Sequence, residues 1–185
     1  MKIVIDLTSL YGRKRTGMEM YAVDLYRALL TSEHQIVPMF HGENEVDNNT
    51  NAIIIPKCNR LWLENVALSR AVRKIKADIV IFPVFPPPTD LYYGCKSKIF
   101  HTIHDTVSLK YRDAQNFAAK YYYRPRSKAF FKKGDGIITI SETVKHQLQA
   151  ITSLPIYNLG ENISVDYKDA DKHIDKQLLE KWGIA

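Results

Sequence analysis

The sequence has few of the features that mark secreted, membrane-spanning or metal-binding proteins. Its 185 residues include two cysteines, Cys58 and Cys95, which lack both CxxC spacing and a nearby group of histidines. A disulfide scaffold is therefore not expected, and a reducing cytoplasm suits the chain. No stretch approaches the ~20 apolar residues of a membrane span. Met1 and Lys2 lead directly into a strand pattern, so a signal peptide is not expected either.

The glycine-rich loops of nucleotide-binding proteins are also missing. The stretch YGRKRTGMEMY, residues 11–21, spaces Gly12 and Gly17 as a P-loop does. Met18 and Glu19 then stand where a P-loop has its lysine and its magnesium-binding hydroxyl, so an ATPase loop is excluded. The dinucleotide pattern Gly-x-Gly-x-x-Gly and the hydrolase pattern Gly-x-Ser-x-Gly are absent as well.

The composition is that of an ordinary globular domain. Hydrophobic residues make up 45% of the chain, enough to build a sizeable core in one large domain. The formal net charge is +6, which is compatible with nucleic acid, anionic lipid or a phosphorylated ligand and does not choose among them.

Strand and helix patterns alternate along the chain. The predicted strands are residues 2–7, 35–40, 52–55, 78–82, 97–103, 136–140 and 155–159. The predicted helices are residues 18–30, 61–76, about 114–133, 141–151 and 172–182. Pro38 suggests that its strand lies near the sheet edge, and the proline-rich residues 83–88 form an extended loop. The continuous apolar strands IVIDL, ADIVIF and DGIITI are typical of strands buried on both faces. The sequence therefore predicts an α/β fold with a Rossmann-like, doubly wound parallel sheet.

Ligands of such sheets bind beyond the carboxyl ends of the strands, which places the loops after four strands on one rim. The first of these loops is basic and includes Arg13. It ends at Thr16, with Glu19 three residues later, a capping-box pattern that starts a helix at about Gly17. The backbone N–H groups at this helix start can bind an anion or a sugar oxygen. The alternative is a plain strand-to-helix turn with a solvated basic tip.

Two further motifs at the rim contain side chains that could bind a ligand or take part in a reaction. In FHTIHDTVSL, His104 and Asp105 follow a strand and can position a sugar hydroxyl or relay a proton, unless they only cap the strand and the next turn. Because His101 and His104 lie three residues apart on a strand, they point to opposite faces, and no metal site is expected. In TISETV, Ser141 and Glu142 open a helix that can bind an anion and receive sugar hydroxyls. They are equally explained as an N-cap and a favourable first-turn acid.

The segment KYYYRPRSKAFFKK, residues 120–133, combines cations and aromatic rings without any acidic residue. Its cations Lys120, Arg124, Arg126 and Lys128 are candidates for contact with an anionic membrane surface. The alternative is a core helix with a solvated basic outer face. Nucleic acid is disfavoured as a partner, because no recognised nucleic-acid-binding motif is present and the rim carries His, Asp and Glu.

Several of these motifs occur in one characteristic order. A first strand in KIVIDLTSL is followed by a loop ending in Thr-Gly, a helix in MEMYAVDLYRALL, a His-Asp strand end in IFHTIHDTV, a Ser-Glu turn in GDGIITISETVKHQL, and a closing PIYNLGENISVDY. This order resembles the N-terminal, acceptor-side domain of a family 4 glycosyltransferase of the two-domain GT-B fold. The usual Asn-Gly turn after the last strand is replaced here by Asn158-Leu159-Gly160, and the first loop is more basic than in many relatives.

The resemblance implies a domain at residues 1–170 and, at residues 171–185, the helical start of a linker to a C-terminal domain that binds the nucleotide-sugar. Such enzymes generally retain anomeric configuration without a metal or other cofactor. His104 is then expected at the reaction centre, holding a donor-sugar hydroxyl, with Asp105 beside it. Thr16, Gly17, Arg13, Ser141 and Glu142 are expected to contact donor or acceptor.

The resemblance further implies a glycan or lipid-linked acceptor, in the cytoplasm or on the inner face of the cytoplasmic membrane. Without a nucleotide-sugar domain, residues 1–185 are expected to be inactive alone. The competing hypothesis is a non-catalytic module that binds a glycolipid or a partner chain.

Overall fold

The computed structural model describes residues 1–12, 16–43, 46, 51–107 and 117–160 of the chain. The core of these residues is a seven-stranded sheet in which every neighbouring pair of strands is parallel. The strands are β1 (Lys2–Asp6), β2 (Gln35–His41), β3 (Ile53–Ile55), β4 (Ile79–Phe82), β5 (Lys98–Ile103), β6 (Gly136–Thr139) and β7 (Ile156–Asn158). All seven predicted strands are present, and the predicted fold class is confirmed.

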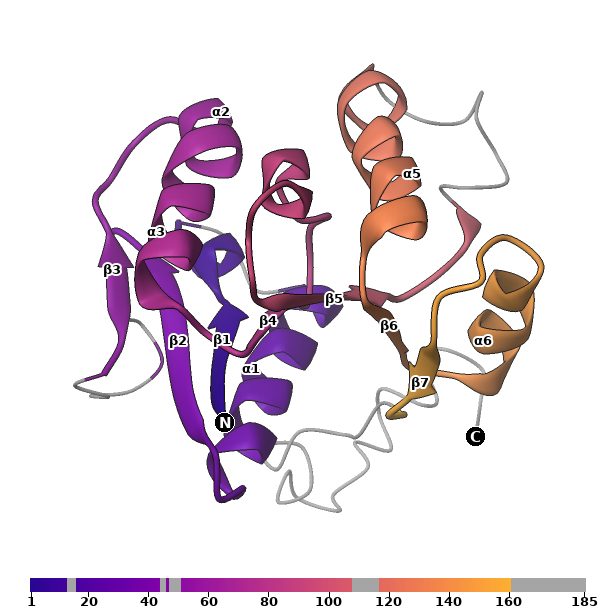
Figure 1. Ribbon diagram of the computed structural model, residues 1–185, viewed down its shortest axis with the longest axis horizontal. Coiled ribbons are helices and arrows are strands. Elements are labelled where there is room, and N and C mark those ends of the chain that lie inside the picture. Colours follow the sequence, from indigo (N-terminus) through magenta and orange to yellow (C-terminus); the bar gives the residue numbers. More distant parts are fainter. Residues whose placement is uncertain (13–15, 44–45, 47–50, 108–116, 161–185) are drawn as a thin grey trace, which may run out of the picture.

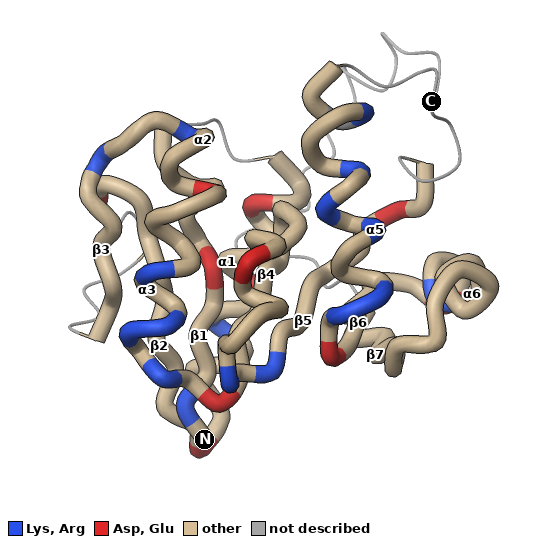
Figure 2. The backbone as a smooth tube through the Cα atoms, turned by 45° about the horizontal axis from the view of Figure 1, so that its top comes forward, with Lys and Arg blue, Asp and Glu red and all other residues tan. Residues whose placement is uncertain are grey.

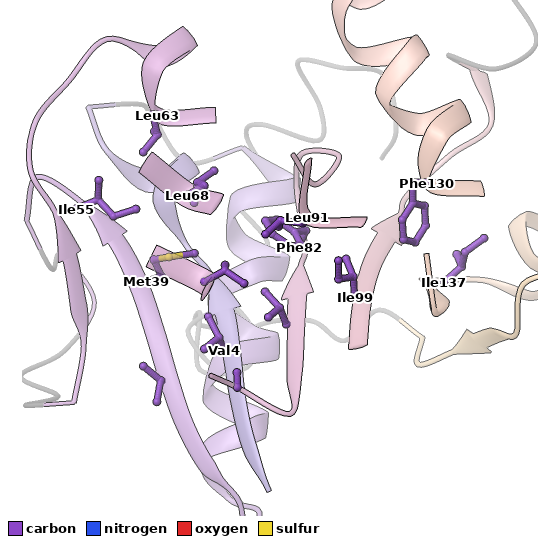
Figure 3. Packing of buried hydrophobic residues seen from close by; sticks show 14 of the residues in the cluster. Val4, Met39, Ile55, Leu63, Leu68, Phe82, Leu91, Ile99, Phe130 and Ile137 are labelled. Carbon is purple, nitrogen blue, oxygen red and sulfur yellow. The ribbon is translucent and has the colours of Figure 1, made fainter. Parts of the chain in front are cut away.

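Helices cover both faces of the sheet (Figure 1). Helix α1 (Gly17–Leu30) packs Ala22, Val23 and Tyr26 against one face. The other face carries α3 (Leu68–Ile75) and α5 (Arg124–Lys133), together with the short helix α6 (Glu142–Gln149). Figure 3 shows this second cluster, in which Val4, Phe82 and Phe130 come from three separate parts of the chain. The apolar strands are therefore buried on both faces, as their sequences predict.

The helical regions contain features that the sequence patterns do not reveal. The predicted helix at 61–76 begins as α2 (Arg60–Trp62), passes through the π-helical segment η2 (Leu63–Ala67) and continues as α3. A second π-helical segment, η4 (Ala119–Tyr123), precedes α5. Two 3₁₀ turns, η1 (Thr8–Leu10) and η3 (Thr89–Tyr92), follow β1 and the proline-rich loop. Single π turns inside helices are frequent at functional sites.

The strand order β3-β2-β1-β4-β5-β6-β7 contains one reversal of direction. From β1 the chain moves outward through β2 to β3, and then it crosses to β4 on the other side of β1. The crevice between the carboxyl ends of β1 and β4 is the position at which open α/β sheets usually bind ligands. Pro38 lies in β2, next to the edge strand, one residue before the register at which β3 begins to pair. The prediction of a place near the edge is therefore confirmed.

Three sequence predictions lie outside the described residues: Arg13, the final helix at 172–182, and the linker at 171–185. Both cysteines, Cys58 and Cys95, are free. Within the part of the chain that the structure describes, no helix is both long and apolar enough to cross a membrane.

Candidate functional site at the carboxyl edge of the sheet

The parallel register brings the carboxyl ends of β1, β4, β5 and β6 to a common edge. Ile5 of β1 pairs with Ile81 of β4, and Phe82 pairs with His101 of β5. Ile103 at the end of β5 pairs with Thr139 at the end of β6. The loops that follow these residues therefore share one rim, as the sequence predicts.

The helix start at Thr16 and Gly17 has the predicted capping box. The backbone N–H of Thr16 donates to the Glu19 carboxylate at 3.0 Å, and the Thr16 hydroxyl donates to the same oxygen. Glu19 is buried, which fixes the first turn of α1. A Cβ added to Gly17 would meet nothing within 4 Å, so there is open space beside the backbone at this helix start.

His104 lies beside the first turns of α1. Its Nε2 is 2.8 Å from the carbonyl oxygen of Pro83, and because a carbonyl only accepts, Nε2 carries the hydrogen. Its ring meets the ring of Tyr21 edge to face, with centroids 4.9 Å apart. In the neutral ring the lone pair is then on Nδ1, which can accept a hydrogen bond from a sugar hydroxyl. The structure thus places His104 against Tyr21, one turn after the helix start at Gly17.

The other predicted rim residues are engaged locally. The Asp105 carboxylate accepts from the backbone N–H of Val107 at 2.9 Å and so closes a turn. Ser141 is the N-cap of α6, where its hydroxyl accepts from the N–H of Val144 at 3.3 Å. Glu142 is exposed, and the Asn158 amide that donates to it at 2.8 Å lowers the pKa of its carboxyl. These contacts match the capping roles that the sequence leaves open, and they leave each side chain at the rim.

His101 points to the opposite face from His104, as predicted. Its Nδ1 donates to the carbonyl of Phe82 at 2.7 Å, and its ring lies against Phe130. Burial lowers the pKa of His101 to about 4. His101 is therefore a structural group, because its neutral imidazole is buried in the core between its hydrogen-bond partner and Phe130.

A pocket of about 250 Å³ opens at the switch point between β1 and β4. It lies between the turn after β1, the end of β2, the helix start at α2 and η2, the loop after β4, and α5. Its lining residues are Asp6, Thr8, Ser9, Tyr11, His41, Cys58, Arg60, Leu63, Glu64, Leu68, Phe82, Phe85, Pro86 and Arg126. The loop that carries Phe85 and Pro86 is the one whose Pro83 carbonyl binds His104. The pocket and His104 therefore share a structural element.

Asp6 provides a buried carboxyl group in this pocket. Its Oδ1 accepts from the N–H of Thr8 at 3.0 Å and from the Thr8 hydroxyl at 2.7 Å. Burial is the largest influence on this carboxyl and raises its pKa to about 6, although the Thr8 bonds act in the other direction. Ser9 follows in the same turn, and its buried hydroxyl oxygen has no hydrogen-bond partner among the described residues.

Glu64 and Arg126 form a buried ion pair in the pocket wall. Arg126 Nη1 is 2.8 Å from Glu64 Oε2, and its Nη2 donates to the Pro86 carbonyl at 2.8 Å. Arg60 Nε and the Tyr123 hydroxyl donate to the other Glu64 oxygen, at 2.6 and 3.1 Å. The two π-helical segments therefore meet at one carboxylate. The prediction that Arg126 contacts a membrane is wrong, because this guanidinium is buried by its ion pair with Glu64.

The remaining cations of the basic segment are less buried. Lys128 is exposed, whereas Lys120 and Arg124 are half-buried. Figure 2 shows the cations spread along α5. Phe117 and Tyr121, which contact each other at 4.8 Å between ring centroids, are also exposed, Phe117 to 79%. The alternative interpretation of this segment is therefore the correct one for α5. The helix packs on the core through Phe130 and has a basic outer face.

The sequence analysis did not identify the pocket residues as a site. Asp6 gave a usable signal, because a carboxylate at the carboxyl end of an apolar strand faces the ligand rim in this fold. No sequence signal marks Glu64, because its burial depends on the π-helical segment η2. A π turn changes which side chains of the helix face the core, and residue spacing does not predict where one occurs.

Two solved structures are similar to this chain. A solved structure of Arabidopsis thaliana UGT89C1 complexed with UDP-L-rhamnose has a TM-score of 0.54 and 10% identity, covering 89% of this chain and 52% of that one. An alpha-glucosyltransferase in complex with UDP and a mismatched DNA has a TM-score of 0.49 and 14% identity, covering 85% of this chain and 40% of that one. The chain thus spans about half the length of these solved proteins, or less. No curated protein sequence matches.

The fold is that of the Rossmann-like N-terminal domain of a GT-B glycosyltransferase, with helices on both faces of a parallel sheet. The sequence model of Glycosyltransferase Family 4 matches residues 15–156, well over half of the chain. The chain therefore belongs to glycosyltransferase family 4, and the resemblance noted from the sequence motifs is confirmed.

Proposed function

We propose that the chain is the acceptor-binding half of a retaining glycosyltransferase, of hexosyltransferase type, that moves a sugar from a nucleotide-sugar to a glycan or glycolipid. The observation that carries this proposal is the placement of His104. It stands at the carboxyl end of β5, fixed by the Pro83 carbonyl and Tyr21, next to the open helix start at Gly17. A ring nitrogen held in this way can position one sugar hydroxyl in the transition state.

The residues present suit a positioning role rather than a nucleophilic one. His104 offers Nδ1 as an acceptor, and Gly17 leaves room for a phosphate or sugar oxygen at the positive end of α1. Thr16, Ser141 and Glu142 complete the rim that would meet donor or acceptor, and we propose Arg13 of the first loop as a further contact. No metal or other cofactor is needed in this scheme.

The donor would be held by a second nucleotide-sugar domain, which the linker at 171–185 would reach. The 185-residue chain alone is then expected to bind common nucleotide-sugars weakly and to transfer no sugar. Calorimetry with UDP-, GDP- and TDP-sugars tests this expectation. A micromolar dissociation constant for any of them would refute the proposal that a second domain holds the donor. Transfer by a two-domain form, followed by NMR of the product anomer, tests retention.

We further propose that the domain works in the cytoplasm, at an anionic membrane surface. The support is a group of aromatic and basic side chains around the start of α5, in which Phe117, Tyr121 and Lys128 are exposed and Lys120 and Arg124 are half-buried. Aromatic rings at the headgroup level and cations near anionic lipid favour weak, reversible binding. The same group also supports the second candidate function, a non-catalytic module that binds a glycolipid or a partner chain.

A further inference from the structure

The pocket between β1 and β4 has the two kinds of wall that a sugar ring needs. Leu63, Leu68 and Phe82 supply apolar surface, and the turn after β1 supplies Asp6, Thr8 and Ser9. A pyranose ring presents apolar C–H faces and a rim of hydroxyls, so it can contact both walls at once. The volume of about 250 Å³ equals about eight water molecules at roughly 30 Å³ each. It therefore has room for one sugar ring.

The charges of the pocket balance one another. Two carboxylates, Asp6 and Glu64, face two guanidinium groups, Arg60 and Arg126. His41 adds no charge near neutral pH, because burial lowers its pKa and its Nε2 accepts from the backbone N–H of Cys58 at 3.0 Å. A charged ligand entering such a pocket loses its hydration without finding a surplus of opposite charge. An uncharged ligand does not meet this penalty.

Two polar groups on the turn after β1 can bind hydroxyls. The Ser9 oxygen is buried and has no partner among the described residues. The hydrogen bonds described for Asp6 go to Oδ1, from Thr8. A carboxylate accepts at both oxygens, and hydrogen bonds from a hydroxyl to an ionised acceptor are stronger than neutral ones.

We propose that this pocket is a subsite for a single uncharged sugar ring, whose hydroxyls bind Asp6 and Ser9. The proposal rests on the proposed function, because it gives the acceptor end that this half of the enzyme would hold. The acceptor is then a neutral glycoside at this position and not a uronic acid or a sugar phosphate. A basic chain of net charge +6 gives no hint of this selectivity.

The selectivity depends on the protonation of Asp6, which faces Glu64 of η2 and Arg126 of α5 and shares the pocket with Arg60 and His41. The pKa of Asp6 is raised to about 6, so the carboxyl is mostly ionised at pH 7.5 and protonated at pH 5. Protonation of Asp6 at pH 5 removes one negative charge from the pocket, so the net charge of the pocket becomes more positive by one. An anionic sugar should then gain affinity relative to a neutral one.

The test is an NMR titration of the isotope-labelled chain with methyl α-glucopyranoside and with its uronate, methyl α-glucopyranosiduronate. At pH 7.5 we expect the glucoside to shift the amide signals of Thr8 and Ser9 and to bind about fivefold or more tightly than the uronate. At pH 5 this preference should narrow or reverse. Asp6→Asn should narrow it at pH 7.5, Ser9→Ala should weaken glucoside binding, and Asp24→Asn on α1 should change neither.

A uronate that binds as tightly as the glucoside at pH 7.5, or an absence of shifts in the pocket amides with both sugars, would overturn the proposal. If Asp6→Asn does not fold, the pH comparison on the wild-type chain decides the question alone. Sugar transfer by a two-domain form that is indifferent to the pocket variants would also overturn it while leaving the proposed function intact. Neutral sugar binding in the pocket of a two-domain form that transfers no sugar would support the subsite and count against the enzyme.

Discussion

Arg126 of α5 and Glu64 of η2 form a buried ion pair, with 2.8 Å between Nη1 and Oε2. The same guanidinium holds the Pro86 carbonyl, so one side chain joins the helix, the π-helical segment and the loop after β4. A buried pair of this kind gives little net stability over an apolar pair, but removing one partner leaves an uncompensated charge.

Arg126→Met should therefore destabilise the fold by about 3–5 kcal/mol. Urea unfolding followed by circular dichroism measures this change. Lys145→Gln, which removes a surface partner of Glu142, is the control and should cause no measurable loss. The double variant Arg126→Met/Glu64→Leu should recover part of the loss, because it removes both buried charges. An Arg126→Met protein as stable as the control would show that the pair is not buried in solution.

The variant Gly17→Ala should leave the stability of the fold unchanged but reduce sugar transfer, if a substrate approaches the backbone at Gly17. A Cβ at this position meets nothing within 4 Å, so unfolding should be unchanged or slightly harder, since alanine is a better helix former than glycine. If a substrate oxygen approaches the backbone here, the methyl group should obstruct it and lower transfer by a two-domain form. Gly94→Ala on a remote turn is a poor control because its φ of +76° strains alanine. Ala28→Ser, a small change at an exposed position in the last turn of α1, is a better control. Equal transfer by Gly17→Ala and wild type would remove Gly17 from the site.

His101 should make stability depend on pH between about 4 and 6.5. Its pKa is about 4 in the folded protein and 6.5 in the unfolded chain, so the unfolded state binds more protons in this window. Stability should rise with pH across the window, by on the order of 3 kcal/mol from this group. Asp6 acts in the opposite direction, because its folded pKa of about 6 lies above the unfolded value of 3.8. Because the two contributions are similar in size and opposite in sign, wild-type stability should change little with pH across this window, whereas stability should fall with pH in His101→Asn and rise with pH in Asp6→Asn. A His101→Asn stability curve with the same pH dependence as the wild-type curve would contradict this role of His101.

Membrane binding should depend on Lys120 and Lys128 of the basic segment and not on the buried Arg126. Lys120→Glu/Lys128→Glu should abolish co-sedimentation with anionic vesicles at low salt, because it replaces two attractive charges by two repulsive ones. The wild-type chain should pellet with anionic vesicles, less so at high salt, and not with neutral ones. Lys74→Glu/Lys96→Glu, at two exposed positions outside the basic segment, serves as a control with the same change of net charge. If the wild type partitions equally to both vesicle types, or to neither, the membrane proposal fails.

The strands and the rim could be predicted from the sequence because apolar strands and capping residues are local signals. IVIDL and DGIITI gave β1 and β6, and Thr16 with Glu19 gave the start of α1. The His104 position followed from the end of β5 together with the rule that ligands bind at carboxyl ends.

The pocket wall could not be predicted in the same way. The burial of Arg126 depends on Glu64, which is 62 residues away in sequence, and on two π-helical segments that bring the pair together. A local scan therefore sees only an arginine among other cations and assigns it to the surface. Which cation of a basic helix is buried depends on a charged partner far away in the sequence, and residue spacing within the helix does not predict that partner.

The central claim is that His104 acts at a glycosyl-transfer centre. The most direct measurement is the turnover of a two-domain form carrying His104→Ala, compared with the wild type and with His34→Ala, an exposed histidine just before β2. The loss of one Pro83 hydrogen bond should leave the fold intact, by circular dichroism. The account predicts that turnover falls on the order of a hundredfold in His104→Ala alone, because a positioning group is lost. Turnover within twofold of the wild type, in a folded His104→Ala protein, would contradict it.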